Sequence, residues 1–146
     1  YENSSLRGKL GYALQTIPTL IESDLPYHFS ILINGENIQR EGIMIAIANA
    51  KQFGTGSVIN PDGALDDGIF EVLIFKKLDV IEILKTLSET SERNPEFVES
   101  FATKHVTVHS DKKVHLQVDG EYIGEVNTIE AQILPSKVRI MLPTTS

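Results

Sequence analysis

Short stretches with a two-residue apolar repeat, separated by turn dipeptides, recur along this chain and constrain its fold more than any other feature. In residues 27–33, aromatic and branched aliphatic side chains fall on every second position, and Asn34-Gly35 follows. Such alternation places the apolar side chains on one face of a strand, and Asn-Gly is favoured in a two-residue hairpin turn. The pattern therefore predicts an antiparallel hairpin, with Ile38 on its second strand.

The remaining apolar patterns extend this prediction to the whole chain. Two nearly continuous apolar runs predict strands buried on both faces, over residues 42–49 and 69–75. Alternating apolar residues predict further strands over 105–109, 114–118, 128–134 and 137–142, with turns at Asp119-Gly120 and Pro135-Ser136. Helical spacing predicts short helices over 5–17, 79–88 and 95–101. We expect a mainly β fold, a β-sandwich of antiparallel strands with two or three short helices.

Composition and charge exclude several classes of function. The chain has 146 residues, no cysteine and a formal net charge of −7. The length suits a single domain over residues 1–146, and the lack of cysteine excludes disulfides and thiolate metal ligands, which fits a cytoplasmic protein. An acidic chain is poorly suited to binding nucleic acid, because phosphate contacts need clustered Lys and Arg. No apolar run reaches the roughly 20 residues of a membrane-spanning helix. The acidic charge gives no overall attraction to anionic lipid, so we expect membrane contact to be local.

Residues 60–68, with the sequence Asn-Pro-Asp-Gly-Ala-Leu-Asp-Asp-Gly, place three aspartates between two apolar strands. Carboxylates and backbone carbonyls are the hard oxygen ligands that Mg²⁺ and Ca²⁺ prefer. The spacing does not match an EF-hand loop, and a polar turn whose aspartates cap backbone amides is the alternative. The residues by themselves leave both interpretations open and favour the polar turn.

Other candidate residues give weaker signals. The Gly-Thr-Gly of residues 54–56 has too few glycines for a nucleotide fingerprint and favours a turn or a β-bulge. Glu121 follows the Asp119-Gly120 turn, where it is either a solvated charge or a general base at a cleft. His105 and His109 share a strand face without a third metal ligand, so we interpret them as surface residues.

Several short motifs occur in a particular order along the chain. They are residues 45–50 (IAIANA), 53–56 (FGTG), Pro61, residues 66–72 (DDGIFEV), 118–121 (VDGE) and 133–135 (ILP). Their order resembles the carboxy-terminal domain of the bacterial diacylglycerol kinase-like lipid kinases, a group related to sphingosine and ceramide kinases. The opening residues 8–12 also fit, and the resemblance covers nearly the whole chain.

This resemblance implies a part of an enzyme. In the family, an amino-terminal domain binds ATP through a Gly-Gly-Asp-Gly-Thr motif, which residues 1–146 do not contain. The chain begins at Tyr1, and we expect it to be the carboxy-terminal half of a longer protein and to be inactive alone. The implied activity is ATP-dependent phosphorylation of the hydroxyl of diacylglycerol or a similar lipid. The implied partners are the nucleotide-binding domain in cis, a lipid alcohol and a transiently contacted membrane, and exposed sheet edges allow a homodimer.

The resemblance also implies roles for particular residues. A structural Mg²⁺ is held by the Asp67 carboxylate and by the backbone carbonyls of Ala64 and Ile69. Glu121 is the base that accepts the proton of the lipid hydroxyl. Two alternatives stay open from the sequence. One is a non-catalytic β-sandwich module that binds lipid or a protein partner, and the other is a related nucleotide kinase acting on a soluble substrate.

Overall fold

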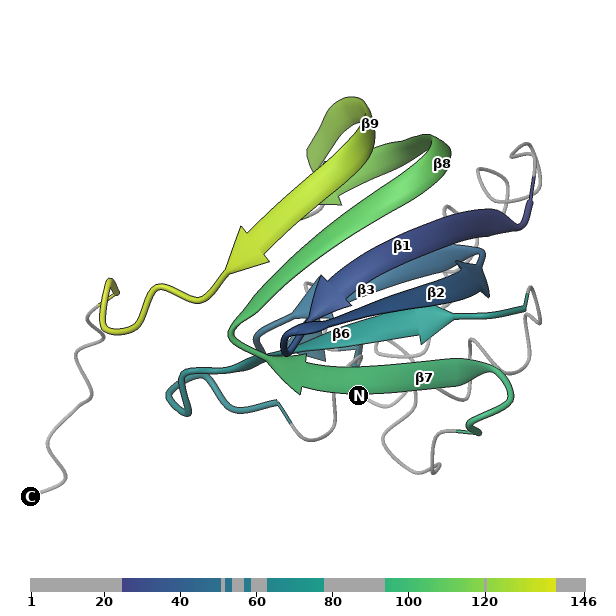
Figure 1. Cartoon of the computed structure of the whole chain (residues 1–146). Helices are drawn as coiled ribbons and strands as arrows, with labels where there is room; N and C mark the ends of the chain where they lie inside the picture. Colours follow the sequence, from purple (N-terminus) through teal and green to yellow (C-terminus); the bar gives the residue numbers. More distant parts are fainter. Residues whose placement is uncertain are drawn as a thin grey trace, which may run out of the picture.

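The computed structural model describes residues 25–50, 52–53, 57–58, 63–77, 94–119 and 121–138. Within these residues the chain forms nine β-strands in a four-stranded, a three-stranded and a two-stranded sheet, and all the strand pairs are antiparallel (Figure 1). This confirms the predicted mainly β, antiparallel class. The predicted helices over 5–17 and 79–88 lie outside the described residues. A helix that could cross a membrane is not found in the part of the chain that the structure describes.

The four-stranded sheet contains the predicted hairpin. Its order is β2-β1-β8-β9, with β1 at Tyr27–Ile33, β2 at Glu36–Gly42, β8 at His105–Val118 and β9 at Glu121–Gln132. Asn34 and Gly35 join β1 to β2 with φ values of 51° and 82°, and positive φ at both positions is what a type I′ turn requires. Ile38 lies opposite Ile31 on the second strand, as predicted.

The three-stranded sheet has the order β3-β6-β7, with β3 at Met44–Ala48, β6 at Phe70–Phe75 and β7 at Val98–Thr103. Every residue of β6 is buried, as its continuous apolar run predicts. The same prediction for β3 was wrong, because Ile47 is 38% exposed and the other β3 residues are half-buried. The reason is position, since β6 is the central strand of the described sheet and β3 lies at its edge.

The prediction of a short helix over residues 95–101 was also wrong. Residues 95–97 form a turn, in which the amides of Phe97 and Val98 donate to the carbonyl of Asn94 at 2.9 and 3.0 Å. The chain then becomes β7, which pairs along the whole of β6. Phe97 and Phe101 have helical spacing in the sequence, but backbone pairing with β6 outweighs that local pattern.

A small third sheet holds the glycine motif. In it β4 at Gln52–Phe53 pairs with β5 at Ser57–Val58, and Phe53 lies opposite Ser57. Residues 54–56 between these strands lie outside the described residues, so the turn or bulge expected there stays a prediction.

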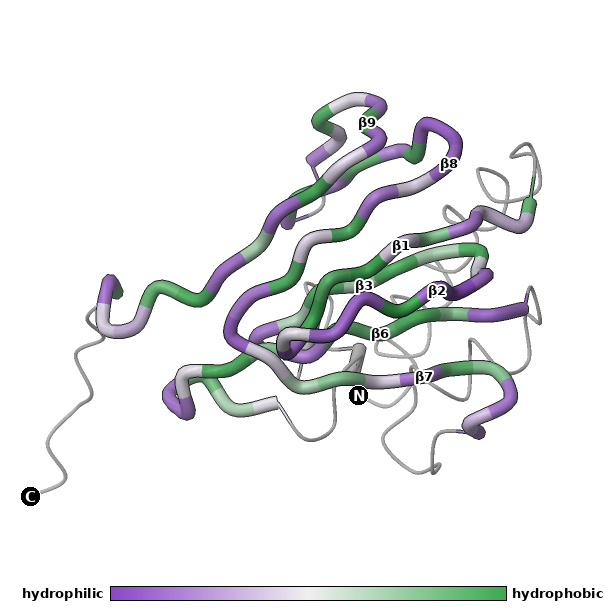
Figure 2. Tube along the Cα trace, in the orientation of Figure 1, coloured by the Kyte–Doolittle hydropathy of each residue, from purple (hydrophilic) through white to green (hydrophobic). Residues whose placement is uncertain are grey.

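The core lies between the two larger sheets, which makes the fold a sandwich. Every second residue of β1, β6 and β8 points into it, and β6 is almost continuously apolar whereas the edge strand β2 is mostly hydrophilic in Figure 2. Burying each such side chain contributes about 1.5–3 kcal/mol relative to leaving it exposed. The buried residues of this cluster are Tyr27, Phe29, Ile31, Ile33, Phe70, Val72, Ile74, Val106 and Val108.

The chain passes from one large sheet to the other at two tight corners. At the first, the Ile43 amide donates to the Phe75 carbonyl at 2.7 Å, and a Cβ on Gly42 would lie 2.8 Å from that same oxygen. Only glycine therefore fits at residue 42. At the second corner the buried Thr103 hydroxyl donates to the His105 carbonyl at 2.9 Å, which fixes the turn from β7 into β8.

An ion pair also links the two sheets. The Arg40 guanidinium on β2 donates two hydrogen bonds to the Glu99 carboxylate on β7, at 2.8 and 2.9 Å. The Lys76 ammonium lies 3.4 Å from the same carboxylate. The hydrogen bond from Arg40 lowers the pKa of Glu99, and the charges of Arg40 and Lys76 act in the same direction.

Strands β8 and β9 extend beyond the rest of their sheet. Strand β8 is one strand of 14 residues, where the sequence predicts two, and its register against β9 shifts between His109 and Val114. It pairs with β1 only over residues 106–110, so the segment from Val114 onward pairs with β9 alone among the described strands. Strand β9 begins at Glu121 rather than at Thr128. The predicted last strand, over 137–142, lies mostly outside the described residues, and residues 137–138 are not in a strand.

Candidate functional site

The segment of residues 60–69, which we call the aspartate loop, leads directly into β6. Within its described part, residues 63–69, the amide of Ile69 donates to Asp67 Oδ1 at 3.1 Å, and Gly68 has a φ of 73°. A carboxylate that accepts from the amide two residues later forms an Asx-type turn. The polar-turn interpretation of this loop is therefore present in the structure, and it occupies only one of the two carboxylate oxygens.

The donor atoms of this loop also suit a hard cation. Asp67 is exposed, Ala64 and Ile69 are half-buried, and the carboxylate and carbonyl oxygens they contribute are the donors that Mg²⁺ takes. Among the described residues there is no cluster of three or more His, Cys, Asp or Glu side chains that could hold a metal. Within these described residues, a cation at Asp67 would take its other ligands from backbone carbonyls and water. The Mg²⁺ assignment fits these residues and stays a prediction.

Glu121 is the first residue of β9, and its side chain is exposed. It lies directly opposite Val118, across the turn that contains Asp119 with a φ of 50°. Gly120 is outside the described residues. Residues directly opposite each other on neighbouring strands project from the same face, so Glu121 shares a face with Val118.

The aspartate loop and Glu121 lie at opposite ends of β8 (Figure 1). The loop leads into Phe70, which pairs with Thr103 at the corner where β8 begins, whereas Glu121 pairs with the last residue of β8. A strand of 14 residues measures about 45 Å along its path at ~3.3 Å per residue. The chain thus does not bring its two predicted sites together, and a cation at Asp67 would not touch groups that react at Glu121.

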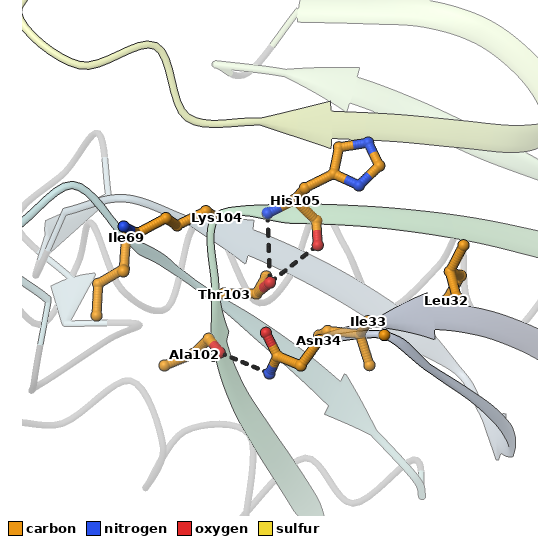
Figure 3. A pocket seen from close by; sticks show the side chains of 9 residues that line it. Leu32, Ile33, Asn34, Ile69, Ala102, Thr103, Lys104 and His105 are labelled. Atoms are coloured by element: carbon orange, nitrogen blue, oxygen red, sulfur yellow. Dashed lines mark hydrogen bonds between the residues drawn. The ribbon is translucent and has the colours of Figure 1, made fainter.

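A hollow of about 560 Å³ lies beside the aspartate loop (Figure 3). It is formed by the β1–β2 turn and the β7–β8 corner, where Asn34 Nδ2 donates to the Ala102 carbonyl at 3.0 Å. Because these segments are distant in the sequence, the residues alone did not reveal the hollow. Its lining is mostly apolar and consists of Leu32, Ile33, Asn34, Gly35, Ile69, Ala102, Thr103, Lys104 and His105.

The histidines lie on the exposed strand faces, as predicted for His105 and His109. His105 Nε2 is 2.7 Å from the Glu130 carboxylate, and His109 Nδ1 is 2.9 Å from the Thr128 hydroxyl. Both contacts join β8 to β9 and stabilise the strand pairing rather than forming a reactive centre.

A third histidine contact joins β1 to β8. His28 Nδ1 is 3.0 Å from Asp111 Oδ2, and the His28 amide donates to Asp111 Oδ1 at 3.1 Å. The backbone hydrogen bond from His28 is the main cause of a lowered pKa of Asp111. Glu41 lies on the other side of the ring, 3.0 Å from His28 Nε2.

Comparison with known proteins finds relatives of this chain. “Probable lipid kinase YegS” of Shigella dysenteriae serotype 1 is 28% identical over 140 residues, covering 94% of this chain and 46% of that protein. The protein of the same name from Escherichia coli O1:K1 has the same identity and coverage. The chain therefore spans about half the length of these relatives.

Solved structures show the same fold. Two crystal structures from Bacillus anthracis strain Sterne superimpose with TM-scores of 0.66 and 0.63, at 16% and 13% identity. The first superposition covers 86% of this chain and 44% of the solved chain, and the second covers 80% and 42%. The second protein is described as a diacylglycerol kinase. Residues 2–142 match the family described as the YegS C-terminal NAD kinase beta sandwich-like domain. The chain belongs to this family of carboxy-terminal β-sandwich domains.

Proposed function

We propose that the full-length protein transfers the γ-phosphate of ATP to the hydroxyl of diacylglycerol or a similar lipid. The observation that carries this proposal is the position of Glu121, an exposed carboxylate at the tip of a projecting hairpin, in a chain whose relatives are named lipid kinases. The chain would act as the carboxy-terminal domain, with ATP bound mainly by a nucleotide-binding domain in cis.

In the proposed reaction Glu121 acts as a general base. Its carboxylate accepts the proton of the lipid hydroxyl while the hydroxyl oxygen forms a bond to the γ-phosphorus. The bond from that phosphorus to the bridging oxygen of ADP breaks in the same displacement, and ADP leaves. A carboxylate suits this role because phosphoryl transfer needs the nucleophile positioned and its proton accepted, with little other covalent chemistry from the protein.

The aspartate loop has a structural part in this proposal. The residues that would hold Mg²⁺ are Asp67, through its carboxylate, and Ala64 and Ile69, through their carbonyls. The bound ion would supply positive charge that draws these oxygens together ahead of β6. Because β8 separates this loop from Glu121, the ion would stabilise the domain rather than contact the transferred phosphate.

The proposal extends to location and partners. The enzyme would be cytoplasmic and would meet its lipid at the membrane surface as a peripheral protein, through transient contact. A homodimer through exposed sheet edges is compatible with the edge strands β2 and β9 of the described sheet.

The direct test is a phosphoryl-transfer assay of the full-length protein with γ-labelled ATP and several acceptors. Diacylglycerol and ceramide in mixed micelles represent lipids, and NAD represents soluble nucleotides. We expect label in diacylglycerol or another lipid alcohol. Label in NAD alone would contradict the proposal and support the second candidate, a soluble nucleotide kinase, which the NAD kinase-like description of the family favours. No labelled acceptor at all would support a non-catalytic binding module.

A further inference from the structure

The part of the β8–β9 hairpin beyond β1, residues 114–118 and 121–126, forms a two-stranded ribbon (Figure 1). Along β8, Val114, Leu116 and Val118 occupy alternate positions and so lie on one face of the ribbon. Val126 lies directly opposite Val114 and joins them on that face. We call these four residues the apolar strip.

The apolar strip continues the core-facing side of the sheet. Val114 packs against the main core cluster, and Val114 and Leu116 are half-buried. Val118 at the tip is 52% exposed. Apolar surface therefore runs outward from the closed core and becomes more accessible toward the tip.

The opposite face of the ribbon carries the polar groups of His115, Tyr122 and Glu125, and Ile123, which is unpaired at the register shift, is also exposed. There the His115 ring lies 3.3 Å from the Tyr122 hydroxyl, and its Nδ1 is 3.9 Å from the Glu125 carboxylate. The ribbon thus has one apolar face and one face that carries polar groups. Two strands alone cannot bury the apolar face against a core of their own. The ribbon projects from the domain, so its apolar face is accessible. Such a face is suited to binding an apolar ligand or partner.

Glu121 stands at the outer end of the apolar strip. It lies opposite Val118 and on the same face, so the carboxylate terminates the row of aliphatic side chains. Leu116 lies opposite Gly124, where an added Cβ would find no atom within 4 Å, so the middle of the strip is open. The path from Val114 to Val118 is about 13 Å at the rise of a β-strand.

We propose that the apolar strip seats the acyl chain of the acceptor lipid and thereby presents the lipid hydroxyl to Glu121. This inference rests on the proposed function and assigns the lipid-selecting residues of that site. The polarity of the strip matches an uncharged amphiphile, because hydrocarbon would lie along Val114, Leu116 and Val118 and a hydrogen-bond donor would meet the carboxylate. A nucleotide acceptor would instead leave the aliphatic side chains without an apolar contact.

The test measures acyl-chain dependence in the full-length protein. We compare dibutyroyl-, dihexanoyl- and dioctanoylglycerol below the concentrations at which they form micelles. The effect of chain length on kcat/KM then reports transfer of the acyl chain from water to the protein. Each methylene that the strip buries should raise kcat/KM by up to about fourfold. The double variant Leu116→Ser/Val118→Ser should lower kcat/KM roughly tenfold for dioctanoylglycerol and less than about twofold for dibutyroylglycerol.

The matched control is Tyr122→Ser, which removes a large exposed side chain from the polar face of the same ribbon. It should leave the chain-length dependence unchanged. If the double variant unfolds, the milder Val118→Thr replaces it. An equal loss for all three acceptors, or the same flattening in Tyr122→Ser, would overturn the proposal. An equal loss would indicate that another part of the full-length protein covers the strip.

A binding readout separates this inference from the proposed function. Methyl NMR signals of Leu116 and Val118 in the full-length protein are followed during titration with dihexanoylglycerol. Saturable shifts at these methyls that persist in the Tyr122→Ser control support the apolar strip even if no lipid is phosphorylated. If lipid is phosphorylated but these methyls do not shift and kcat/KM is independent of chain length, the strip is not the acyl site and the kinase proposal stands.

Discussion

The two halves of β8 differ in what surrounds them. Residues 106–110 lie between β1 and β9, and Val106 and Val108 pack against β6 of the other large sheet. Residues 114–118 pair with β9 alone among the described strands, and their apolar face ends at Glu121. The same alternation of valine and leucine therefore builds a closed core in one half and an open surface in the other. Apolar periodicity in a strand does not by itself say whether the buried face meets protein or ligand.

This difference separates stability from function along one strand. Residues 106–110, the closed half of β8, belong to the core between the sheets. This core, the two corners and the ion pair between Arg40 and Glu99 should set the free energy of unfolding of the domain. The open half has fewer buried contacts, so it should tolerate substitution and open locally at a lower free energy.

The sharpest comparison uses one residue type on the same face of β8. Val106 is fully buried and Val118 is 52% exposed. We expect Val106→Ala to lower the free energy of unfolding by about 2–3 kcal/mol, through lost burial and a cavity. We expect Val118→Ala to cost less than about 0.5 kcal/mol. Denaturant unfolding of both variants checks this, and equal losses would show that the ribbon is as closed as the core.

The corner at Gly42 tests how tightly the closed half is built. Gly42→Ala places a methyl 2.8 Å from the Phe75 carbonyl oxygen, so the backbone must shift. We expect a loss of about 2 kcal/mol in the free energy of unfolding. Glu41→Ala, at the neighbouring exposed position, is the control and should cost much less. A thermal melt in which the two variants match would show that the crossing between the sheets is loose.

Mg²⁺ should act on the closed end of β8 and not on the ribbon. With Mg²⁺ at tenfold its Kd, we expect about 1.4 kcal/mol of added stability. Asp67→Asn should abolish this gain, because the amide keeps the acceptor for Ile69 but loses the charge, whereas Asp66→Asn should keep it. Hydrogen exchange should show protection near residues 63–69. Protection at the ribbon, or an equal response of the two variants, would refute the Asp67 site.

The link between Arg40 and Glu99 gives the smallest effect. Its hydrogen bonds lower the pKa of Glu99 from the ordinary value of 4.5. Since the pKa is lower in the folded state, the pair stabilises the protein above about pH 4.5 and loses this contribution as pH falls through the folded-state pKa. The side chains are 34% and 24% exposed, so we expect about 1 kcal/mol or less. Glu99→Gln should differ from the native protein at pH 7 and approach it in acid, as unfolding curves would show.

Much of the fold could be predicted from local pattern. The hairpin around Asn34-Gly35 and the buried strand β6 follow from periodicity and turn chemistry alone. The errors arose where tertiary position decides the outcome. The sequence around β7 has a helical pattern, but pairing with β6 makes it a strand. Strand β3 is less buried than its composition suggests because it lies at a sheet edge.

The roles of the candidate site residues stay predictions, and their arrangement could not be predicted from the sequence. The family resemblance implies roles for Asp67 and Glu121, and the structure places these residues at opposite ends of β8. The alternation over 114–118 and the turn at Asp119-Gly120 could be predicted, but the second strand of the ribbon could not, because residues 121–127 show no apolar alternation. Only the register of β8 against β9 shows that Glu121 and Val118 share a face.

The most direct test of the central claim is the lipid phosphorylation rate of the full-length protein with Glu121→Gln, beside Asp119→Asn on the same turn. Glutamine keeps the size of the side chain but cannot accept the hydroxyl proton. We predict a 10²–10⁴-fold fall in kcat for Glu121→Gln, unchanged unfolding, and near-native activity for Asp119→Asn. Turnover within a few-fold of the native rate in Glu121→Gln would contradict the role of this carboxylate as the base.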